Sequence, residues 1–365
     1  MSKRRSNNEG SIFKEASTGL WVAEISLPDG TRKRKRGKSQ QAVREWLQAS
    51  INQLKQGNLV VDDRVTVSEF IDRYFNDVAR HNLRPKTLES YESLIRIHIK
   101  PGLGHYRLSA LNPLIIQKFY SDKLNAGLSK RTVQFIHSIL HKALNQALRL
   151  GLVYRNVTDL VDHPNPKRKA PEVWSIEEVK KFLNAVKDHR FFVIYLLSVY
   201  LGMREGEVLG IYFEDVDILH RTIHVKHAVQ ALKGGLVVTE PKTESSKRAV
   251  SIPSSIISIL TDYLYIQKRN QGLIFTTSSG KPISPRNLVR HFKSAIKETG
   301  LPNIRFHDLR HTHASLLLAA GVHPKIVQER LGHSQISLTL DTYSHVIPSL
   351  QLEAADKMDQ LMGNM

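Results

Sequence analysis

Several residues with phosphate-directed chemistry lie close together near the end of the chain. His307 and Arg310 belong to the segment His-Asp-Leu-Arg-His, His333 follows Leu-Gly, and Tyr343 lies ten residues after His333. Guanidinium and imidazole groups bind phosphate oxygens, and a phenol is a nucleophile that can hold the energy of a broken phosphodiester in a covalent bond. This grouping predicts cleavage of a nucleic-acid strand by Tyr343. The ordinary alternative for one tyrosine among eleven is a buried core residue.

A second arginine completes the predicted phosphate site. Arg204 lies in Leu-Gly-Met-Arg-Glu-Gly-Glu, directly after an apolar stretch. Planar guanidinium groups form paired hydrogen bonds to the non-bridging oxygens of a phosphate under attack, which a lysine cannot reproduce. Glu207, three residues on, is expected to orient Arg204. One arginine on a helix is usually a surface charge, but Arg204 and Arg310 in two such motifs favour catalysis.

The histidines of these motifs are candidates for proton transfer. His307 and His333 are expected to donate to the same phosphate or to accept the phenol proton, because imidazole titrates near neutral pH. His311, four residues after His307, shapes or supports the pocket. This spacing is also typical of zinc sites, but Asp308 stands where a metallopeptidase has glutamate, and Arg310 would place a cation beside the metal. We therefore expect no metal.

A lysine is the candidate general acid. Lys242 lies in Thr-Glu-Pro-Lys-Thr, between predicted strands at 236–240 and 248–252, from where its ammonium group would protonate the leaving 5′ oxygen. Lys247 and Arg248 are nearby alternatives, and a lysine in a hairpin is ordinarily just solvated.

Composition agrees with a polyanionic partner. Lysine and arginine number 53 against 34 acidic residues, a formal net charge of +19, and the chain has no cysteine. Such a charge attracts nucleic acid, and the lack of cysteine excludes disulfides, thiolate metal sites and sulfur nucleophiles. The start of the chain has no apolar signal segment, and the longest apolar stretch, 191–203, is interrupted and too short to span a bilayer. We expect a cytoplasmic protein without a membrane partner, nucleoid-associated when bound to DNA.

The first of three predicted regions, residues 1–60, combines a small β-sheet with one helix. Alternating residues at 21–27 and the turn Pro28-Asp29-Gly30 predict a hairpin, and Ser39 is expected to cap a helix. The return strand carries charge on both faces, so one face cannot be an ordinary core face. We expect it to bind a DNA groove, although a solvated basic tail is the alternative. The candidate DNA-binding residues here are Arg32, Lys33, Arg34, Lys35, Arg36 and Lys38.

Residues 64–163 are predicted to form an all-α bundle of four to five helices. The predicted starts are the capping box of Thr66 with Glu69, Thr87, Asn112-Pro113 and Ser129. The polar faces include Lys86 and Arg131, which we expect to contact phosphates, although such charges are more often simply solvated. Predicted linkers flank this region at 57–63 and 163–171.

Residues 172–365 are predicted to be mixed α+β and mainly helical. Ser175 with Glu178 forms another capping box, and short strands at 222–230, 236–240 and 248–252 would make one small antiparallel sheet. An apolar pattern from Leu350 to Met362 predicts an amphipathic terminal helix.

The motifs around Arg204, His307, Arg310, His333 and Tyr343 resemble, in order and spacing, the signature of the tyrosine recombinases, the phage integrase family. The helical region is similar to that family's core-binding domain, and the first region to the arm-binding domain of integrases from phages and conjugative transposons. The resemblance implies a site-specific recombinase that integrates or excises a mobile element through a 3′-phosphotyrosyl intermediate, with a lysine on the hairpin as general acid and no cofactor. It also implies double-stranded DNA partners with core- and arm-type sites, a homo-tetramer on DNA, a terminal helix that docks on a neighbouring protomer, and an accessory DNA-bending or excision factor.

Two other functions remain open from the sequence. A type IB topoisomerase uses similar chemistry but reseals the same strand, and the basic N-terminal hairpin argues against it because simple relaxation does not require a second DNA-binding surface. A DNA-binding regulator would keep the fold without cleavage, but none of the expected tyrosine, arginine or histidine residues is missing.

Overall fold

The computed structural model describes residues 10–26, 32–55, 64–166, 171–240, 247–343 and 350–363. The chain divides into two units, Met1–Lys167 and Arg168–Met365. Each unit is described by itself below. Among the described residues, no helix has the length and apolarity needed to cross a membrane.

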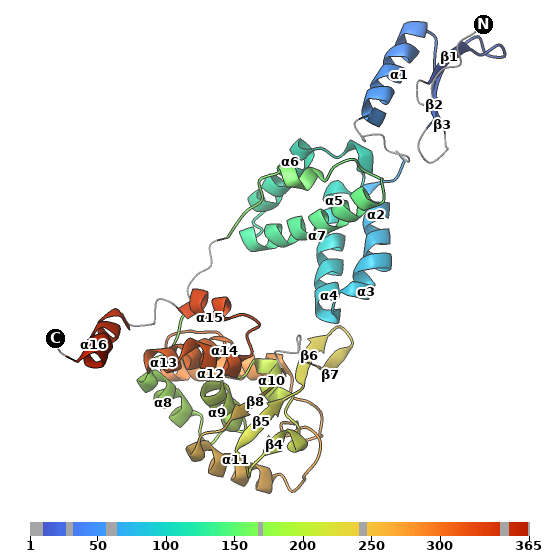
Figure 1. Ribbon diagram of the computed structural model, residues 1–365. Helices are drawn as coiled ribbons and strands as arrows, with labels where there is room; N and C mark the ends of the chain where they lie inside the picture. The colour runs from blue at the N-terminus through green and yellow to red at the C-terminus, as the bar shows by residue number, and fades with distance from the viewer. Residues whose placement is uncertain are drawn as a thin grey trace. The chain divides into compact units, whose positions relative to one another are not determined.

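The N-terminal part of the first unit is a three-stranded antiparallel sheet with one helix on it (Figure 1). Its elements are β1 (Ser11–Lys14), β2 (Trp21–Ser26), β3 (Arg32–Gly37) and α1 (Gln40–Lys55). The expected hairpin of β2 with β3 and the helix after Ser39 are confirmed, and β1 is an additional strand. Ala23 and Ile25 pack against Val43 and Leu47 of α1. The turn at 28–30 lies outside the described residues.

Four helices form the rest of the first unit, which confirms the all-α bundle. Their bounds are α2–η1–α3 (Val67–Asn82, with a π-helical part at Tyr74–Ala79), α4–η2–α5 (Pro85–Leu103, with a π-helical part at Ile95–Ile99), α6 (Pro113–Asn125) and α7 (Lys130–Arg149). Short 3₁₀ turns lie at Leu108–Ala110 and Val157–Leu160.

The predicted helix starts at Thr66, Asn112 and Ser129 are confirmed as side-chain caps. The start at Thr87 is wrong. The helix begins two residues earlier at Pro85, with Arg84 as its N-cap, because proline fixes the helical φ at the first position. The predicted linker at 57–63 lies outside the described residues.

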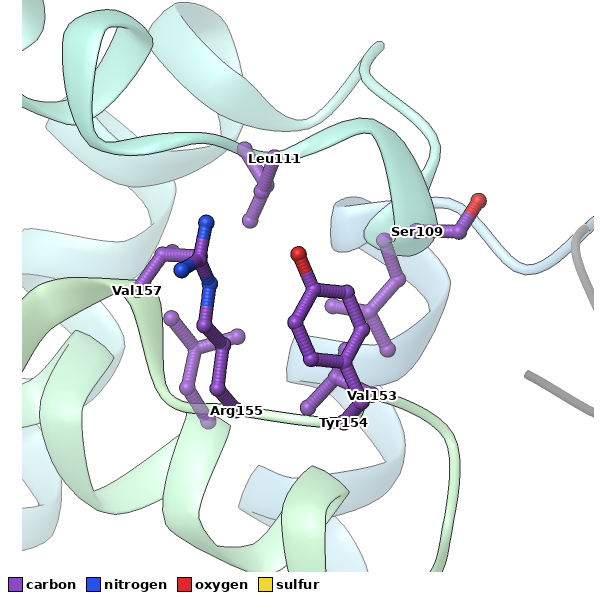
Figure 2. Close-up of a pocket in the computed structure, with 8 residues that line it drawn as sticks. Ser109, Leu111, Val153, Tyr154, Arg155 and Val157 are labelled. Atoms are coloured by element: carbon purple, nitrogen blue, oxygen red, sulfur yellow. The ribbon is translucent and has the colours of Figure 1, made fainter. Parts of the chain in front are cut away.

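A small pocket lies in this helical bundle (Figure 2). Tyr154 and Arg155 line it together with aliphatic side chains such as Leu111 and Val157. Its volume of about 10 Å³ accommodates about one water molecule. It is therefore too small to hold a cofactor.

The second unit is mainly helical with two small antiparallel sheets (Figure 1). Its helices are α8 (Ile176–Ala185), α9 (Phe192–Leu201), α10 (Glu205–Leu209), α11 (Ser254–Ile266), α12 (Pro285–Thr299), α13 (Asp308–Ala319), α14 (Pro324–Leu331), α15 (Ile336–Tyr343) and α16 (Leu350–Met362). Its strands are β4 (Val216–Asp217), β5 (Thr222–Val225), β6 (Ala228–Leu232), β7 (Gly235–Thr239) and β8 (Arg248–Ser251).

The sheet arrangement differs in detail from the expectation of one sheet. The stretch predicted as a single strand at 222–230 is divided between β5, in the sheet β4-β5-β8, and β6, which pairs only with β7. At the division, Lys226 and His227 contact the buried carboxylate of Asp215 at 3.0 and 3.5 Å.

An aromatic core joins α8 and α12 and is tied to α13 by a hydrogen bond. Trp174 packs against Phe182 of α8 and Phe292 of α12. Its indole Nε1 donates to the carbonyl of Pro302 at 3.0 Å, and its backbone NH donates to Oγ1 of Thr312 at 3.1 Å. The first turns of α13 are thereby joined to the segment that precedes α8.

Candidate active site

The turn between α9 and α10 positions Arg204. Gly202 caps α9 in the left-handed region, with φ of 64°. A Cβ at this position would lie 2.6 Å from the ring of His313 and 2.8 Å from Leu331, so the tight packing here also requires glycine. Arg204 then becomes the N-cap of α10.

Glu207 connects Arg204 to a second buried arginine. Its carboxylate accepts hydrogen bonds from the backbone and side chain of Arg204 and from Nη2 of Arg248 at 2.9 Å. Burial opposes ionisation, but the cations of Arg248, Arg204 and Arg310 overcome this and hold the pKa of Glu207 at about 2. The predicted pairing of Glu207 with Arg204 is therefore present, and Glu207 is a charged anchor at neutral pH.

The N-terminal turn of α13 holds Arg310 in a fully buried position. Its Nη1 donates to the carbonyl of Gly202 at 2.9 Å and its Nη2 to the carbonyl of Leu331 at 2.5 Å. One guanidinium group thus joins the segment before Arg204 to the segment before His333. The three predicted motifs meet at Arg310.

The predicted histidines lie in the same region. His307 precedes α13, and its ring meets that of His311 edge-on, with ring centroids 5.1 Å apart. Nδ1 of His333 lies 2.9 Å from Oγ1 of Thr339, a fully buried residue of α15. The backbone of His333 is held by Gln328, whose Nε2 donates to its carbonyl at 2.7 Å.

Burial makes these imidazoles neutral. Desolvation lowers the pKa of His307 to about 4, with further lowering by His311, Arg310 and Arg204. Desolvation and the cations of Arg310 and Arg204 lower the pKa of His333 to about 3. Near neutral pH both rings therefore have one nitrogen that can donate and one that can accept a proton.

The candidate general acids have different surroundings. Lys242 lies outside the described residues. Lys247 is paired with Glu240 at 3.3 Å near the surface. Arg248, the other alternative, has a buried guanidinium group that pairs with Glu207 and donates from Nε to the carbonyl of Arg330 at 2.7 Å.

Tyr343 is the last residue of α15. The structure describes its backbone but not its side chain. The same short helix carries Thr339, which contacts His333. Thr339 is four residues before Tyr343. The backbone of Tyr343 is therefore only one helical turn from a residue that contacts His333, one of the predicted catalytic histidines.

Comparison with known proteins gives the family. The model of the phage integrase family matches residues 173–349, and that of the phage integrase N-terminal SAM-like domain matches residues 66–124. A XerC-like tyrosine recombinase of Caldanaerobacter subterraneus is 30% identical, and the match covers 90% of this chain and 92% of the relative. This chain belongs to the phage integrase family. It is a tyrosine site-specific recombinase of the kind that integrates and excises mobile elements.

Other relatives and solved structures similar to this recombinase are also integrases. The ICEBs1 integrase of Bacillus subtilis is 31% identical over 76% of this chain and 79% of its own length. A Tn1549 transposon integrase, solved in complex with a circular intermediate DNA, has a TM-score of 0.69 at 22% identity, covering 81% of this chain and 99% of that chain. A lambda integrase dimer bound to a core site has a TM-score of 0.60 at 20% identity, covering 94% and 96%. These structures confirm the predicted fold class.

The candidate DNA-binding residues of the recombinase fall into distinct groups. The register of β3 on β2 places Arg32, Arg34 and Arg36 on the face opposite α1, whereas the lysines alternate with them on the other face. Arg32 and Arg34 pair with Glu24, and Arg36 pairs with Glu15 at 3.0 Å. The lysines of this group are Lys33, Lys35 and Lys38.

The two helical candidates of the recombinase lie in first turns. Lys86 of α4 pairs with Glu89 at 3.1 Å, and Arg131 of α7 donates to Gln134 at 3.1 Å. Both are exposed. His137 of α7 is buried, and its Nδ1 lies 3.0 Å from the hydroxyl of Tyr120.

Sequence analysis missed three residues beside the predicted site. Arg330, His313 and Thr339 contribute side-chain contacts among α9, α13, α14 and α15. Thr339 lies between His333 and Tyr343 in the sequence, and Arg330 lies three residues before His333, but this spacing does not indicate their partners, which depend on tertiary packing.

Proposed function

We propose that Tyr343 attacks a DNA phosphate. Its phenolic oxygen forms a bond to phosphorus, the bond from phosphorus to the 5′ oxygen breaks, and a 3′-phosphotyrosyl link and a free 5′ hydroxyl remain. The 5′ hydroxyl of a partner strand then attacks this link and releases the phenol. One phosphodiester replaces another, so the exchange needs no cofactor.

Arg204 and Arg310 are assigned to the non-bridging oxygens of the phosphate. The observation that carries this assignment is the buried guanidinium of Arg310 bonded to the carbonyls of both Gly202 and Leu331. Two bonds fix the plane of the group before DNA arrives, so little reorganisation is needed as negative charge develops in the transition state.

His307 and His333 are assigned to proton transfer and phosphate contact. A neutral imidazole accepts the phenol proton as the oxygen–phosphorus bond forms, or donates a hydrogen bond to the phosphate. In His333, Nδ1 is engaged by Thr339, so Nε2 is the nitrogen assigned to either role. His311 supports His307 through the edge-on ring contact. Lys242 is assigned as the general acid that protonates the leaving 5′ oxygen, and Glu207 as the anchor of Arg204.

The partner is double-stranded DNA. We assign residues 1–60 to arm-type sites, 64–163 to core-type sites and 172–365 to catalysis together with the tail helix. The net charge of +19 supports this partner. Four copies act on two duplexes, with an accessory DNA-bending or excision factor, as expected for this kind of integrase.

Strand exchange is tested with two duplexes that carry the attachment sites of the element, one of them labelled. Recombinant products that disappear with Tyr343→Phe support the proposal. The same preparation is incubated with a supercoiled plasmid that lacks these sites. Efficient relaxation of that plasmid without recombinant products would instead identify a topoisomerase.

A further inference from the structure

Arg330, in the last turn of α14, has no role in the chemistry proposed above, yet it makes more long-range contacts than a surface cation would. Its Nη2 donates to the carbonyl of Tyr200 in α9 at 3.0 Å and to the carbonyl of Ser251 in β8 at 3.1 Å. Its Nε donates to Nε2 of His313 in α13 at 3.2 Å. One side chain therefore ties the end of α14 to three other elements.

The contact with His313 requires a particular state of that imidazole. Nδ1 of His313 lies 2.8 Å from the carbonyl of Val199, which can only accept, so Nδ1 carries the proton and Nε2 is the acceptor for Arg330. Burial and the cation of Arg330 lower the pKa of His313 to about 3. The imidazole remains neutral, as the contact demands. All three acceptors of Arg330 are thus uncharged groups set by the fold.

The segment that Arg330 anchors is also the segment that orients the active-site arginines. The backbone carbonyl of Arg330 accepts from Arg248, the partner of Glu207, at 2.7 Å. The next carbonyl, of Leu331, accepts from Arg310 at 2.5 Å. A shift of this last turn would move the acceptors of both arginines together.

The chain leads from this turn directly to His333. Gly332 follows α14 in the left-handed region with φ of 66°, and His333 comes next. Leu331 also packs closely on Gly202: a Cβ at Gly202 would lie 2.8 Å from the Leu331 side chain. The turn before Arg204 therefore cannot move without also displacing Leu331. Arg330 is therefore placed to act on three proposed catalytic groups, Arg204, Arg310 and His333, through the backbone of this turn.

We propose that Arg330, together with His313, is a positioning residue for strand cleavage: it fixes the end of α14 so that the Leu331 and Arg330 carbonyls orient Arg310 and, through Arg248 and Glu207, Arg204. This inference rests on the proposed function, because it assigns those two arginines to the phosphate. It predicts that loss of Arg330 slows the chemical step and leaves DNA binding intact.

The test uses the full-length protein and a nicked duplex that carries the end of the element, so that the covalent adduct accumulates. Arg330→Met keeps much of the side-chain volume but removes all donors. At saturating DNA we expect its first-order rate constant of adduct formation to fall by about tenfold or more, since small misplacements of catalytic groups are costly. The Kd for the duplex should stay within about twofold. Lys297→Met, at an exposed position in the last turn of α12, is the matched control and should leave both quantities unchanged.

A second substrate separates positioning from a general loss of structure. In a methylphosphonate at the scissile position, one non-bridging oxygen is replaced by a methyl group, so there is less negative charge for the arginines to stabilise. If Arg330 acts through Arg310 and Arg204, the ratio of wild-type to Arg330→Met rate constants should shrink toward one on this substrate. An equal loss on both substrates, or no loss on the phosphodiester, would overturn the inference.

Two further variants keep the test decisive if Arg330→Met does not fold. Arg330→Lys retains the charge but places a single nitrogen where a planar fork reaches three acceptors, so an intermediate rate is expected. His313→Leu removes the acceptor for Arg330 at a similar volume and should reduce the rate in the same direction. Wild-type rates for both would overturn the inference, whereas absence of an adduct from the wild-type protein itself would refute the proposed function.

Discussion

Arg248 and Glu207 form an ion pair that is buried on both sides, with 2.9 Å between Nη2 and the carboxylate oxygen. The pair joins β8 to α10, and Glu207 also binds Arg204. It therefore links the stability of the second unit to the geometry of its proposed phosphate site.

Replacing Glu207 with glutamine should destabilise the fold as well as slow cleavage. The substitution leaves the cation of Arg248 buried without its counter-charge, which typically costs about 3–5 kcal/mol. Urea unfolding at pH 7 measures the change in the free energy of unfolding. Glu240→Gln, at an exposed carboxylate that pairs with Lys247, is the control and should change it by less than about 0.5 kcal/mol.

The same carboxylate predicts how stability depends on acid. The pKa of Glu207 is about 2 in the folded protein against an ordinary value of 4.5. The contribution of ionised Glu207 to the free energy of unfolding is therefore complete above pH 4.5 and is lost as the pH falls from about 4.5 toward 2. Wild-type unfolding free energy should fall more steeply than that of Glu207→Gln in this window. Parallel curves would contradict the assigned ionisation of Glu207.

The imidazoles of His307 and His333, which we propose to be catalytic, should remain neutral in the free protein under mildly acidic conditions. The pKa values of His307 and His333 are about 4 and 3, below the ordinary value of 6.5. NMR titration of ¹³C-labelled histidine should show both rings unprotonated at pH 5.5, with His307→Asn and His333→Asn used to assign their signals. A midpoint near 6.5 for either ring would contradict its desolvated environment. Because the unfolded chain protonates first, these histidines also reduce stability as the pH falls below about 6.5.

How much of this site could be predicted from sequence depends on the range of each interaction. The capping boxes at Thr66 and Ser175 were predictable because both partners lie within one helical turn. The pairing of Arg204 with Glu207 was predictable for the same reason. The contacts of Arg330 to Tyr200 and Ser251 cross 130 and 79 residues of sequence, and no local pattern indicates them.

Errors in the predicted elements have similarly physical causes. Thr87 was chosen as a helix start although Pro85, which favours the first helical position, stands two residues before it. The stretch at 222–230 has strand-forming residues at both ends, but it is divided at Lys226 and His227, which lie beside the buried Asp215. The first error concerns two competing helix-start signals that are both visible in the sequence. The second concerns packing between residues that are apart in the sequence.

In the N-terminal sheet, Glu24 should sharpen recognition of DNA sequence. Its nearly buried carboxylate pairs with Arg32 and Arg34 on the face opposite α1, which restricts the directions of their guanidinium groups. A guanidinium group held in one orientation can form two hydrogen bonds to guanine, which favours binding to guanine over other bases by about 1–3 kcal/mol.

Selection from randomised duplexes supplies the probe for this prediction. Glu24→Gln should lower the preference for the selected duplex over a scrambled one by about tenfold in fluorescence anisotropy. Glu45→Gln, which makes the same change of charge on exposed α1, should retain the preference. Equal preferences for wild-type protein and Glu24→Gln would show that the carboxylate serves the fold alone.

Removal of the tail helix should weaken assembly. Met358, Leu361 and Met362 of α16 are exposed apolar side chains, and we expect them to pack against a neighbouring protomer on DNA. Deletion of residues 350–365 should leave the one-protomer complex intact in a gel-shift titration and move larger complexes to protein concentrations about tenfold higher. Unchanged formation of the larger complexes would remove the helix from the assembly interface.

Covalent trapping tests the central claim most directly. A nicked duplex carrying the end of the element is incubated with the intact protein or with Tyr343→Phe, and the products are separated on a denaturing gel. The account predicts a protein–DNA adduct, linked through a 3′ phosphate to Tyr343, that forms only when this tyrosine is present. An equal adduct from Tyr343→Phe, or no adduct from the intact protein while DNA binding is retained, would contradict the assignment of Tyr343 as the nucleophile.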